Sequence, residues 1–378
     1  MTSTPDTNKI IALFPELLGP GGVQEAGRQT AVALTQIADR KNWSTIFLSL
    51  NDPFGPQSFS ASEGEFSSLG FGRAKTKFVF AALRHSGKNS RVVIAAHPHL
   101  AVPAALMKWK SAQLKTIVIS HGIEVWTPLP RFRRSALVAA DVVLAPSNDT
   151  ARKLAEVQGV SAAKIHKLPW PLNTSFLEWA DASAELIAPR GLPAGRFVLT
   201  VGRWAASERY KGADDLIRAV AQLRDAAPDL QLVAVGGGGD LPRLKKLGAK
   251  LGVAERIHFF EKLSRKELAA CFARAEIFAL PSSGEGFGLV FLEAMAFGRP
   301  VIGAACGGVT DLVEDGVNGL LVPPRDPGKL AEALDRLLRD EALRAELGRR
   351  GAEIVRRKFS FAVFGAELEK ILAECGLS

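Results

Sequence analysis

Short apolar runs alternate with amphipathic helical patterns along the whole 378-residue chain, and this alternation limits the fold more than any other feature. Short apolar runs bounded by turn residues are typical of buried strands. We expect strands at residues 10–14, 44–50, 91–96, 116–120, 141–145, 197–201, 231–235, 257–260, 277–280 and 301–302. Strands that alternate with helices build parallel sheets, so the sequence predicts an α/β protein.

The segments between these strands carry apolar residues at the 3.6-residue spacing of amphipathic helices. We expect helices at residues 24–37, 151–158, 214–225, 241–251, 266–273, 289–296, 330–338, 341–355 and 361–373.

A proline- and glycine-rich stretch near the middle of the chain predicts a domain boundary. One core rarely serves more than about 250 residues, so a chain of this length should hold at least two domains. We expect an N-terminal domain at residues 1–180, a linker at about 169–196, and a second domain at 196–357. Each has about five predicted strands, which suits two doubly wound sheets.

Basic residues are concentrated in the N-terminal half of a chain whose net charge is +9. No acidic residue occurs between Glu65 and Glu124, an interval with nine basic residues interleaved with Phe80, Leu106 and Trp109. Such segments can lie at an anionic membrane surface, which is our hypothesis for this face. A core-facing helix with a solvated basic side is the alternative. No recognition motif accompanies the charge, so we expect no nucleic acid partner.

The most informative segment is a glycine-rich turn between a predicted strand and a predicted helix. Gly284, Gly286 and Gly288 let the backbone approach a ligand closely, and a helix N-terminus offers N–H groups to an anion. Glu285 in the turn and Glu293 in the helix are carboxylates that can accept hydrogen bonds from sugar hydroxyls. Taken alone, the segment is also compatible with a structural turn and two solvated glutamates.

Two cations follow the first predicted strand of the C-terminal half. Arg203 and Lys211 combine a planar guanidinium with a flexible ammonium, which suits a diphosphate, although either alone is compatible with an ordinary surface residue. Further glycine-rich turns follow other strands, at residues 236–239 and 306–311. Parallel strands end at one edge of their sheet, where open α/β sheets bind ligands, so we expect these loops to meet there.

Together these residues resemble the retaining nucleotide-sugar glycosyltransferases of family 4. The resemblance runs from residue 197 to 325 and, more weakly, includes Gly21, Gly22 and His121 in the N-terminal half. It implies the GT-B fold, with two doubly wound Rossmann-like domains facing a central cleft. It also implies that a last helix, at residues 358–378, packs back on the N-terminal domain.

The resemblance implies a role for each matching residue of the C-terminal half. Arg203 and Lys211 would neutralise the donor diphosphate, Glu285 would contact hydroxyls of the donor sugar, and Glu293 would hold the nucleotide ribose. Backbone N–H groups would hold phosphate or sugar oxygens at Gly286, Phe287, Gly288 and Leu289. Where the family commonly has a glycine by the nucleobase, this chain has Glu261 and Lys262, and we place Lys262 in the donor site.

In the N-terminal half, Gly21 and Gly22 would let a loop close over the diphosphate, and His121 would face the anomeric region. The alternative for His121 is a turn histidine whose hydrogen bonds are satisfied locally. The catalytic residues implied are therefore His121, Glu285, Arg203 and Lys211.

The function implied is transfer of a hexose from a UDP- or GDP-linked sugar to a glycan or lipid-linked acceptor, with retention of configuration, in polysaccharide biosynthesis. We expect no cofactor and no metal, because the sequence has no Asp-x-Asp element suited to a diphosphate-bound cation. A GT-B nucleotide-sugar epimerase and a non-catalytic nucleotide-sugar-binding subunit are the alternatives. The apolar run 10–14 is too short for a signal peptide, so we expect a cytoplasmic protein, with peripheral association at the inner membrane face as a further hypothesis.

Overall fold

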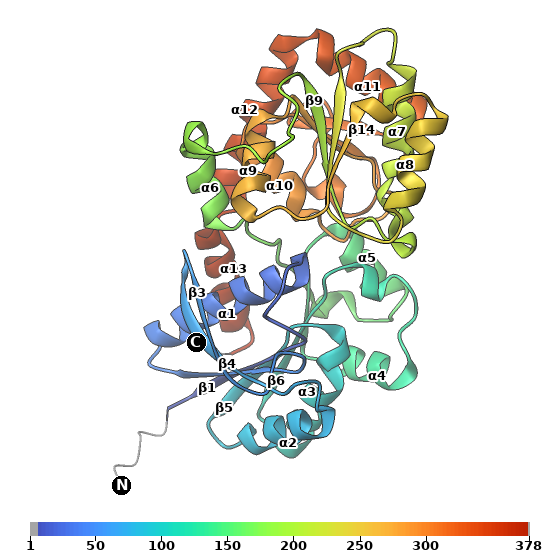
Figure 1. The fold of residues 1–378 in the computed structure, drawn as a ribbon. Coiled ribbons are helices and arrows are strands. Elements are labelled where there is room, and N and C mark those ends of the chain that lie inside the picture. Colours follow the sequence, from blue (N-terminus) through green and yellow to red (C-terminus); the bar gives the residue numbers. More distant parts are fainter. Residues whose placement is uncertain (1–6, 377–378) are drawn as a thin grey trace. The chain divides into compact units, whose positions relative to one another are not determined.

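The computed structural model describes residues 7–376, and these residues form two α/β units (Figure 1). Unit 1 comprises the residues up to Pro171 together with those from Phe361 onward, and unit 2 comprises Leu172–Ser360. Residues 1–6 and 377–378, at the ends of the predicted first domain and last helix, lie outside the described residues. Unit 2 therefore begins earlier in the chain than the sequence-based boundary.

Unit 1 is built on an eight-stranded sheet in the order β3-β4-β2-β1-β5-β6-β7-β8. Its strands are β1 (Lys9–Phe14), β2 (Ser44–Ser49), β3 (Gly55–Ala61), β4 (Gly64–Gly70), β5 (Ser90–Ala95), β6 (Lys115–Ile119), β7 (Val142–Ala145) and β8 (Ile165–Lys167). The β3/β4 pair is antiparallel, and the other neighbours pair in parallel. The strand order reverses between β1 and β5, so this is a doubly wound sheet.

Two groups of helices cover the two faces of this sheet (Figure 1). On one face lie α1 (Gly22–Arg40) and α13 (Phe361–Glu374), which pack against each other and share an ion pair of 2.6 Å between Arg40 and Glu369. The other face is covered by α2 (Lys75–His85), α3 (Ala101–Lys110), α4 (Arg131–Ala139) and α5 (Asn148–Glu156). The last helix of the chain thus belongs to unit 1 although it follows all of unit 2 in sequence.

Unit 2 is built on a six-stranded sheet in the order β11-β10-β9-β12-β13-β14, in which every neighbouring pair is parallel. Its strands are β9 (Phe197–Val201), β10 (Gln231–Val235), β11 (Ile257–Phe260), β12 (Ile277–Leu280), β13 (Val301–Ala304) and β14 (Gly319–Val322). This is the strand order of a Rossmann fold, and it reverses between β9 and β12.

The helices of unit 2 also form two layers. One face of the sheet carries α7 (Ala213–Gln222), α8 (Leu241–Lys250) and α11 (Pro327–Arg339), whose leucines form one apolar cluster with the strands. The opposite layer contains α6 (Thr174–Asp181), α9 (Arg265–Arg274), α10 (Leu289–Ala296) and α12 (Glu341–Lys358). A group of buried phenylalanines fills this second layer, at Phe176, Phe272, Phe278, Phe291 and Phe297.

The predicted α/β class with two doubly wound parallel sheets is confirmed. Four strands were not predicted, namely β3, β4, β8 and β14. Strand β3 alternates partly buried with exposed residues, β4 is rich in glycine and serine, and β8 and β14 have only three and four residues. Helix α6 lies in the stretch taken for a linker, yet it packs on α9 and α10 within unit 2.

We predict that Phe272→Ala destabilises unit 2 by about 3–5 kcal/mol, because it empties a site that Phe278 and Phe297 cannot refill without moving. The Phe272 side chain is fully buried, with ring centroids 5.9 Å from Phe278 and 6.0 Å from Phe297. Denaturant unfolding measures the loss, and Ile187→Ala, at an exposed position of the same unit, should stay close to wild type. Equal stability of the two variants would contradict this packing.

Candidate active site

The loops after β9 and β12 meet at the point where the strand order of unit 2 reverses. Ser283 donates its backbone N–H to the carbonyl oxygen of Tyr210 at 2.7 Å, which joins the two loops directly. Gly212 has φ 77°, and a side chain there would collide with the backbone of Pro281. Glycine at 212 is therefore required for the two loops to lie this close. Open α/β sheets bind ligands at such a reversal point.

Lys211 and Glu285 come together across these two loops. The Lys211 Nζ lies 3.1 Å from the Glu285 Oε1, and their side chains are 16% and 12% exposed. Arg203, on the β9 loop, is 75% exposed and forms an ion pair with the buried carboxylate of Glu208. Three of the predicted site residues thus share one edge of the sheet, and Glu208 joins them as a residue that the sequence did not indicate.

The charges of this cluster affect the pKa of the Tyr210 phenol. Burial raises the pKa of Tyr210 to about 12, the negative charge of Glu285 adds to the rise, and the positive charge of Arg203 opposes it. Tyr210 is therefore a neutral hydrogen-bonding group at every physiological pH.

The glycine-rich turn after β12 leads directly into α10. Gly288 has φ 102° and is the N-cap of α10, where no side chain caps the helix. Gly308, in the loop after β13, donates its N–H to the carbonyl oxygen of Glu285 at 2.7 Å and so fixes the turn. Glu293 lies within α10 and is partly buried, and Phe287 packs its ring against Phe359. The N-terminus of α10 therefore follows Glu285 by a few residues and lies on the same edge of the sheet as the Lys211–Glu285 pair.

Lys262 lies at a different part of this edge. It follows β11, the outermost strand, and its side chain is exposed. Strand β10 lies between β11 and β9, so the loop with Lys262 begins two strands away from the loop with Lys211, and its place in the donor site stays a prediction.

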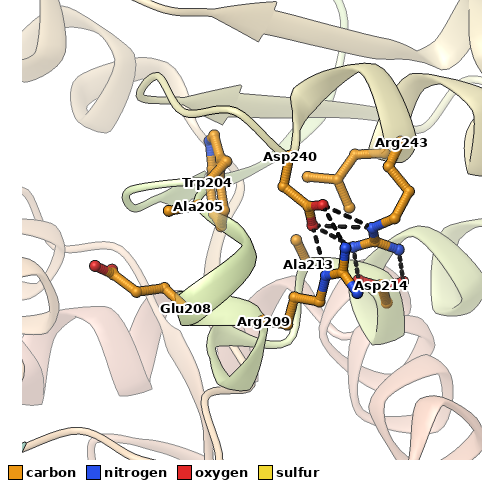
Figure 2. Close-up of a pocket in the computed structure, with 9 residues that line it drawn as sticks. Trp204, Ala205, Glu208, Arg209, Ala213, Asp214, Asp240 and Arg243 are labelled. Carbon is orange, nitrogen blue, oxygen red and sulfur yellow. Dashed lines mark hydrogen bonds and ion pairs between the residues drawn. The ribbon is translucent and has the colours of Figure 1, made fainter.

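A small hollow beside the β9 loop holds a network of ion pairs (Figure 2). Arg243 lies 2.6 Å from Asp240 and 2.5 Å from Asp214, and Arg209 lies 2.8 Å from Asp240. Hydrogen bonds from Arg243, and secondly from Arg209, hold the pKa of Asp240 well below its usual range. Both guanidinium groups are paired, so we infer that this ion-pair network is structural and links the β9 loop to the starts of α7 and α8. The spacing of its four residues in the sequence did not predict it.

The predicted residues of unit 1 follow β1 and β6. Gly21, with φ 140°, and Gly22 are exposed at the start of α1. Arg28 donates to the carbonyl oxygen of Leu17 at 2.6 Å and thereby fixes the preceding loop. Gly21, Gly22 and His121 belong to unit 1, whereas Arg203, Lys211 and the glutamates belong to unit 2.

His121 follows β6 with its ring stacked on two neighbours. Its ring centroid lies 5.1 Å from Trp170 and 5.7 Å from His97. Its Nε2 lies 2.8 Å from the carbonyl oxygen of Ala96, and because a carbonyl only accepts, the proton of the neutral ring belongs on Nε2. The Nδ1 atom is then the acceptor of the ring. This contact joins the loop after β6 to the end of β5, 25 residues earlier in the chain, and it sets the tautomer.

His97, at the end of β5, is a further residue that the sequence analysis missed. Its Nδ1 accepts the backbone N–H of His99 at 3.2 Å. Burial, and secondly the neighbouring charges of His121, His99 and Arg133, lower the pKa of His97 from 6.5 to about 3. The available signal was the His97-Pro98-His99 triplet directly after a predicted strand.

Residues 7–376 contain no cluster of three or more His, Cys, Asp or Glu side chains placed to hold a metal ion.

Comparisons with known proteins match both units. A family model described as "Glycosyl transferases group 1" matches residues 189–354, and one described as "Glycosyltransferase Family 4" matches residues 63–176. The chain is 34% identical over 288 residues to the GDP-mannose-dependent alpha-(1-6)-phosphatidylinositol monomannoside mannosyltransferase of Mycolicibacterium smegmatis, covering 72% of this chain and 74% of that one. The chain belongs to the family 4 glycosyltransferases.

Two further relatives of this glycosyltransferase carry other names. The alpha-D-kanosaminyltransferase of Streptomyces kanamyceticus is 32% identical over 68% of this chain and 66% of its own length. The D-inositol 3-phosphate glycosyltransferase of Stackebrandtia nassauensis is 36% identical over 58% of this chain and 52% of its own length. The family models and these relatives favour glycosyl transfer over the epimerase alternative.

Solved structures share the fold of this glycosyltransferase. The sucrose-phosphate synthase of Thermosynechococcus elongatus matches with a TM-score of 0.76 and 24% identity, over 97% of this chain and 99% of that chain. Anabaena HepE in complex with UDP-glucose matches with a TM-score of 0.71 and 20% identity, over 97% and 99%. The predicted GT-B fold and the predicted family are both confirmed.

We predict that His97 makes unit 1 less stable in acid. The unfolded chain takes up a proton on His97 as the pH falls below 6.5, whereas the folded protein keeps this ring neutral down to a pH of about 3. Stability is therefore lost as the pH falls between these values, by about 2 kcal/mol at pH 5.

Denaturant unfolding at pH 7 and pH 5 measures this effect as the difference between wild type and His97→Gln. The variant should lose about 2 kcal/mol less than wild type over this interval. Parallel losses in the two proteins would contradict the neutral state of the partly buried His97 ring.

Proposed function

We propose that this glycosyltransferase moves a hexose from a UDP- or GDP-linked sugar to a lipid-linked or glycan acceptor, with retention and without a metal ion. The observation that carries the proposal is the meeting of Lys211 and Glu285, with Arg203 nearby, where the sheet order of unit 2 reverses. The names of similar proteins support the choice of donor, since one relative uses GDP-mannose and one solved structure contains UDP-glucose.

Glycosyl transfer requires positive charge beside the diphosphate leaving group. Breaking the bond from the anomeric carbon to the diphosphate leaves negative charge on phosphate oxygens, and preorganised cations and helix dipoles stabilise that charge. The site offers positive charge from Arg203, Lys211 and the uncapped N-terminus of α10. All three lie along one edge of the sheet. In this proposal Glu285 binds sugar hydroxyls, Glu293 binds the ribose, and the cations stand in for a metal ion. Retention is carried over from the family.

The proposed acceptor is anionic and held at a membrane surface. Three helices that pack side by side, α2, α3 and α4, leave Phe80, Trp109 and Phe132 exposed among basic residues. Names of two relatives include a phosphatidylinositol monomannoside and an inositol 3-phosphate. Within residues 7–376, no helix has the length and apolar character required to cross a membrane. We therefore propose peripheral docking through this aromatic and basic face.

We predict that Lys211→Ala and Glu285→Ala each abolish transfer, with losses on the order of 100-fold or more, because each removes a group aimed at the diphosphate or the sugar. The melting temperature should fall by only a few degrees, because neither change opens the apolar core. Turnover is measured with purified protein after calorimetric screening of UDP-, GDP- and ADP-sugars identifies the donor.

Exposed positions of unit 2 supply matched controls, Lys246→Ala and Glu255→Ala, which should keep wild-type turnover. Wild-type turnover in both site variants would refute the site. Incubation with donor alone separates the rival functions, since an epimerase converts the nucleotide sugar without an acceptor and a non-catalytic subunit leaves it intact. The anomeric configuration of the product, read by NMR, tests retention.

For membrane docking, we predict that the protein co-sediments with vesicles containing anionic lipid and not with neutral vesicles, since each basic residue near such a surface adds about 1 kcal/mol. The double variant Phe80→Ser, Trp109→Ser should bind roughly ten-fold more weakly because it loses apolar insertion. Ile187→Ser, an exposed position in unit 2, is the control. Equal binding to both kinds of vesicle, or no binding, would contradict docking.

A further inference from the structure

Glu208 is a buried carboxylate within the loop that carries the two donor-site cations. It lies between Arg203 and Lys211 in sequence, in a 3-10 segment, Ala206–Lys211, whose backbone is kinked at Glu208 with φ −118° and ψ 24°. Its side chain is 8% exposed. A carboxylate this deeply buried is costly unless cations compensate it, so its contacts should explain why it is there.

Both contacts of Glu208 are with the cations assigned to the diphosphate. Its Oε1 accepts hydrogen bonds from the Arg203 guanidinium, and its Oε2 lies 4.0 Å from the Lys211 Nζ. Figure 2 shows the Glu208 side chain pointing away from Arg209, Asp240 and Arg243, so it takes no part in that network.

These contacts make the site electrically balanced before any donor binds. Arg203 and Lys211 carry two positive charges, while Glu208 and Glu285 carry two negative charges. Glu208 is nearly inaccessible to solvent, whereas Arg203 is mostly exposed, so the acid is the fixed partner and the guanidinium is the mobile one. An incoming diphosphate must therefore compete with a carboxylate that cannot move away.

We propose that Glu208 is an internal counter-anion that competes with the diphosphate for Arg203 and Lys211 and so weakens the binding of the nucleoside diphosphate product. The inference rests on the proposed function, because it requires the diphosphate to bind at these two cations. Glu208 is a positioning residue in this account, since it acts on the ligand through Arg203 and Lys211.

The test is the variant Glu208→Gln, which keeps the shape and an acceptor oxygen toward Arg203 but removes the negative charge. Calorimetry with UDP, GDP and ADP should show roughly five- to ten-fold tighter binding of the nucleotide that wild type binds, as expected for losing one charge at this range in a partly screened site. Affinity for the matching uncharged nucleoside, measured by competition, should not change. A residue with a merely structural role would weaken binding or leave it unchanged.

The control is Glu276→Gln, which makes the same charge change at the amino end of β12, where Glu276 pairs with Arg344 at 3.2 Å. Its nucleotide affinity should match wild type. If Glu208→Gln does not fold, Glu208→Met, which has a similar volume and no charge, takes its place with the same expected gain.

Two failures can be told apart. If wild type binds a nucleotide and the charge-removing variant binds it no more tightly, Glu208 is not a counter-anion, although the donor site stands. If wild type binds none of the three nucleotides, the proposed function falls and this inference falls with it.

Discussion

The close approach of the β9 and β12 loops is the constraint on which the donor site depends. Lys211 and Glu285 can pair at 3.1 Å only because Gly212 lies against Pro281 without a side chain and Gly308 fixes the turn that holds Glu285. The Rossmann strand order sets β9 and β12 side by side at the reversal point, so the pair lies where the fold leaves room for a ligand. The position of the Lys211–Glu285 pair thus follows from the strand order of the sheet.

The basic residues of the β9 loop in unit 2 are balanced by nearby carboxylates. The cations of the β9 loop form two separate groups. Arg209 belongs to the ion-pair network of Asp240 and Arg243, whereas Arg203 and Lys211 pair with Glu208 and Glu285. In unit 1 the loops after β5 and β6 carry imidazoles, at His97 and His121. His97 is held neutral by burial, and it stacks on His121, whose proton the Ala96 carbonyl directs to Nε2. The carboxyl edges of the two sheets therefore carry different side-chain chemistry.

Most of the fold could be predicted from the sequence because buried parallel strands are continuous apolar runs, and β9 to β12 lie at the residues expected. The β3/β4 hairpin could not, since its strands are polar on one face and rich in serine and glycine. The meeting of Lys211 with Glu285 followed from family resemblance and the shared sheet edge. Glu208 and His97 were missed for one reason: their importance comes from burial and from partners that only the folded chain supplies.

A crystal structure with bound UDP or GDP tests the central claim most directly. We expect diphosphate oxygens within about 3 Å of the Lys211 Nζ and the Arg203 guanidinium, at the start of α10. A diphosphate seated elsewhere, for example on Arg209 and Arg243 or wholly within unit 1, would contradict it.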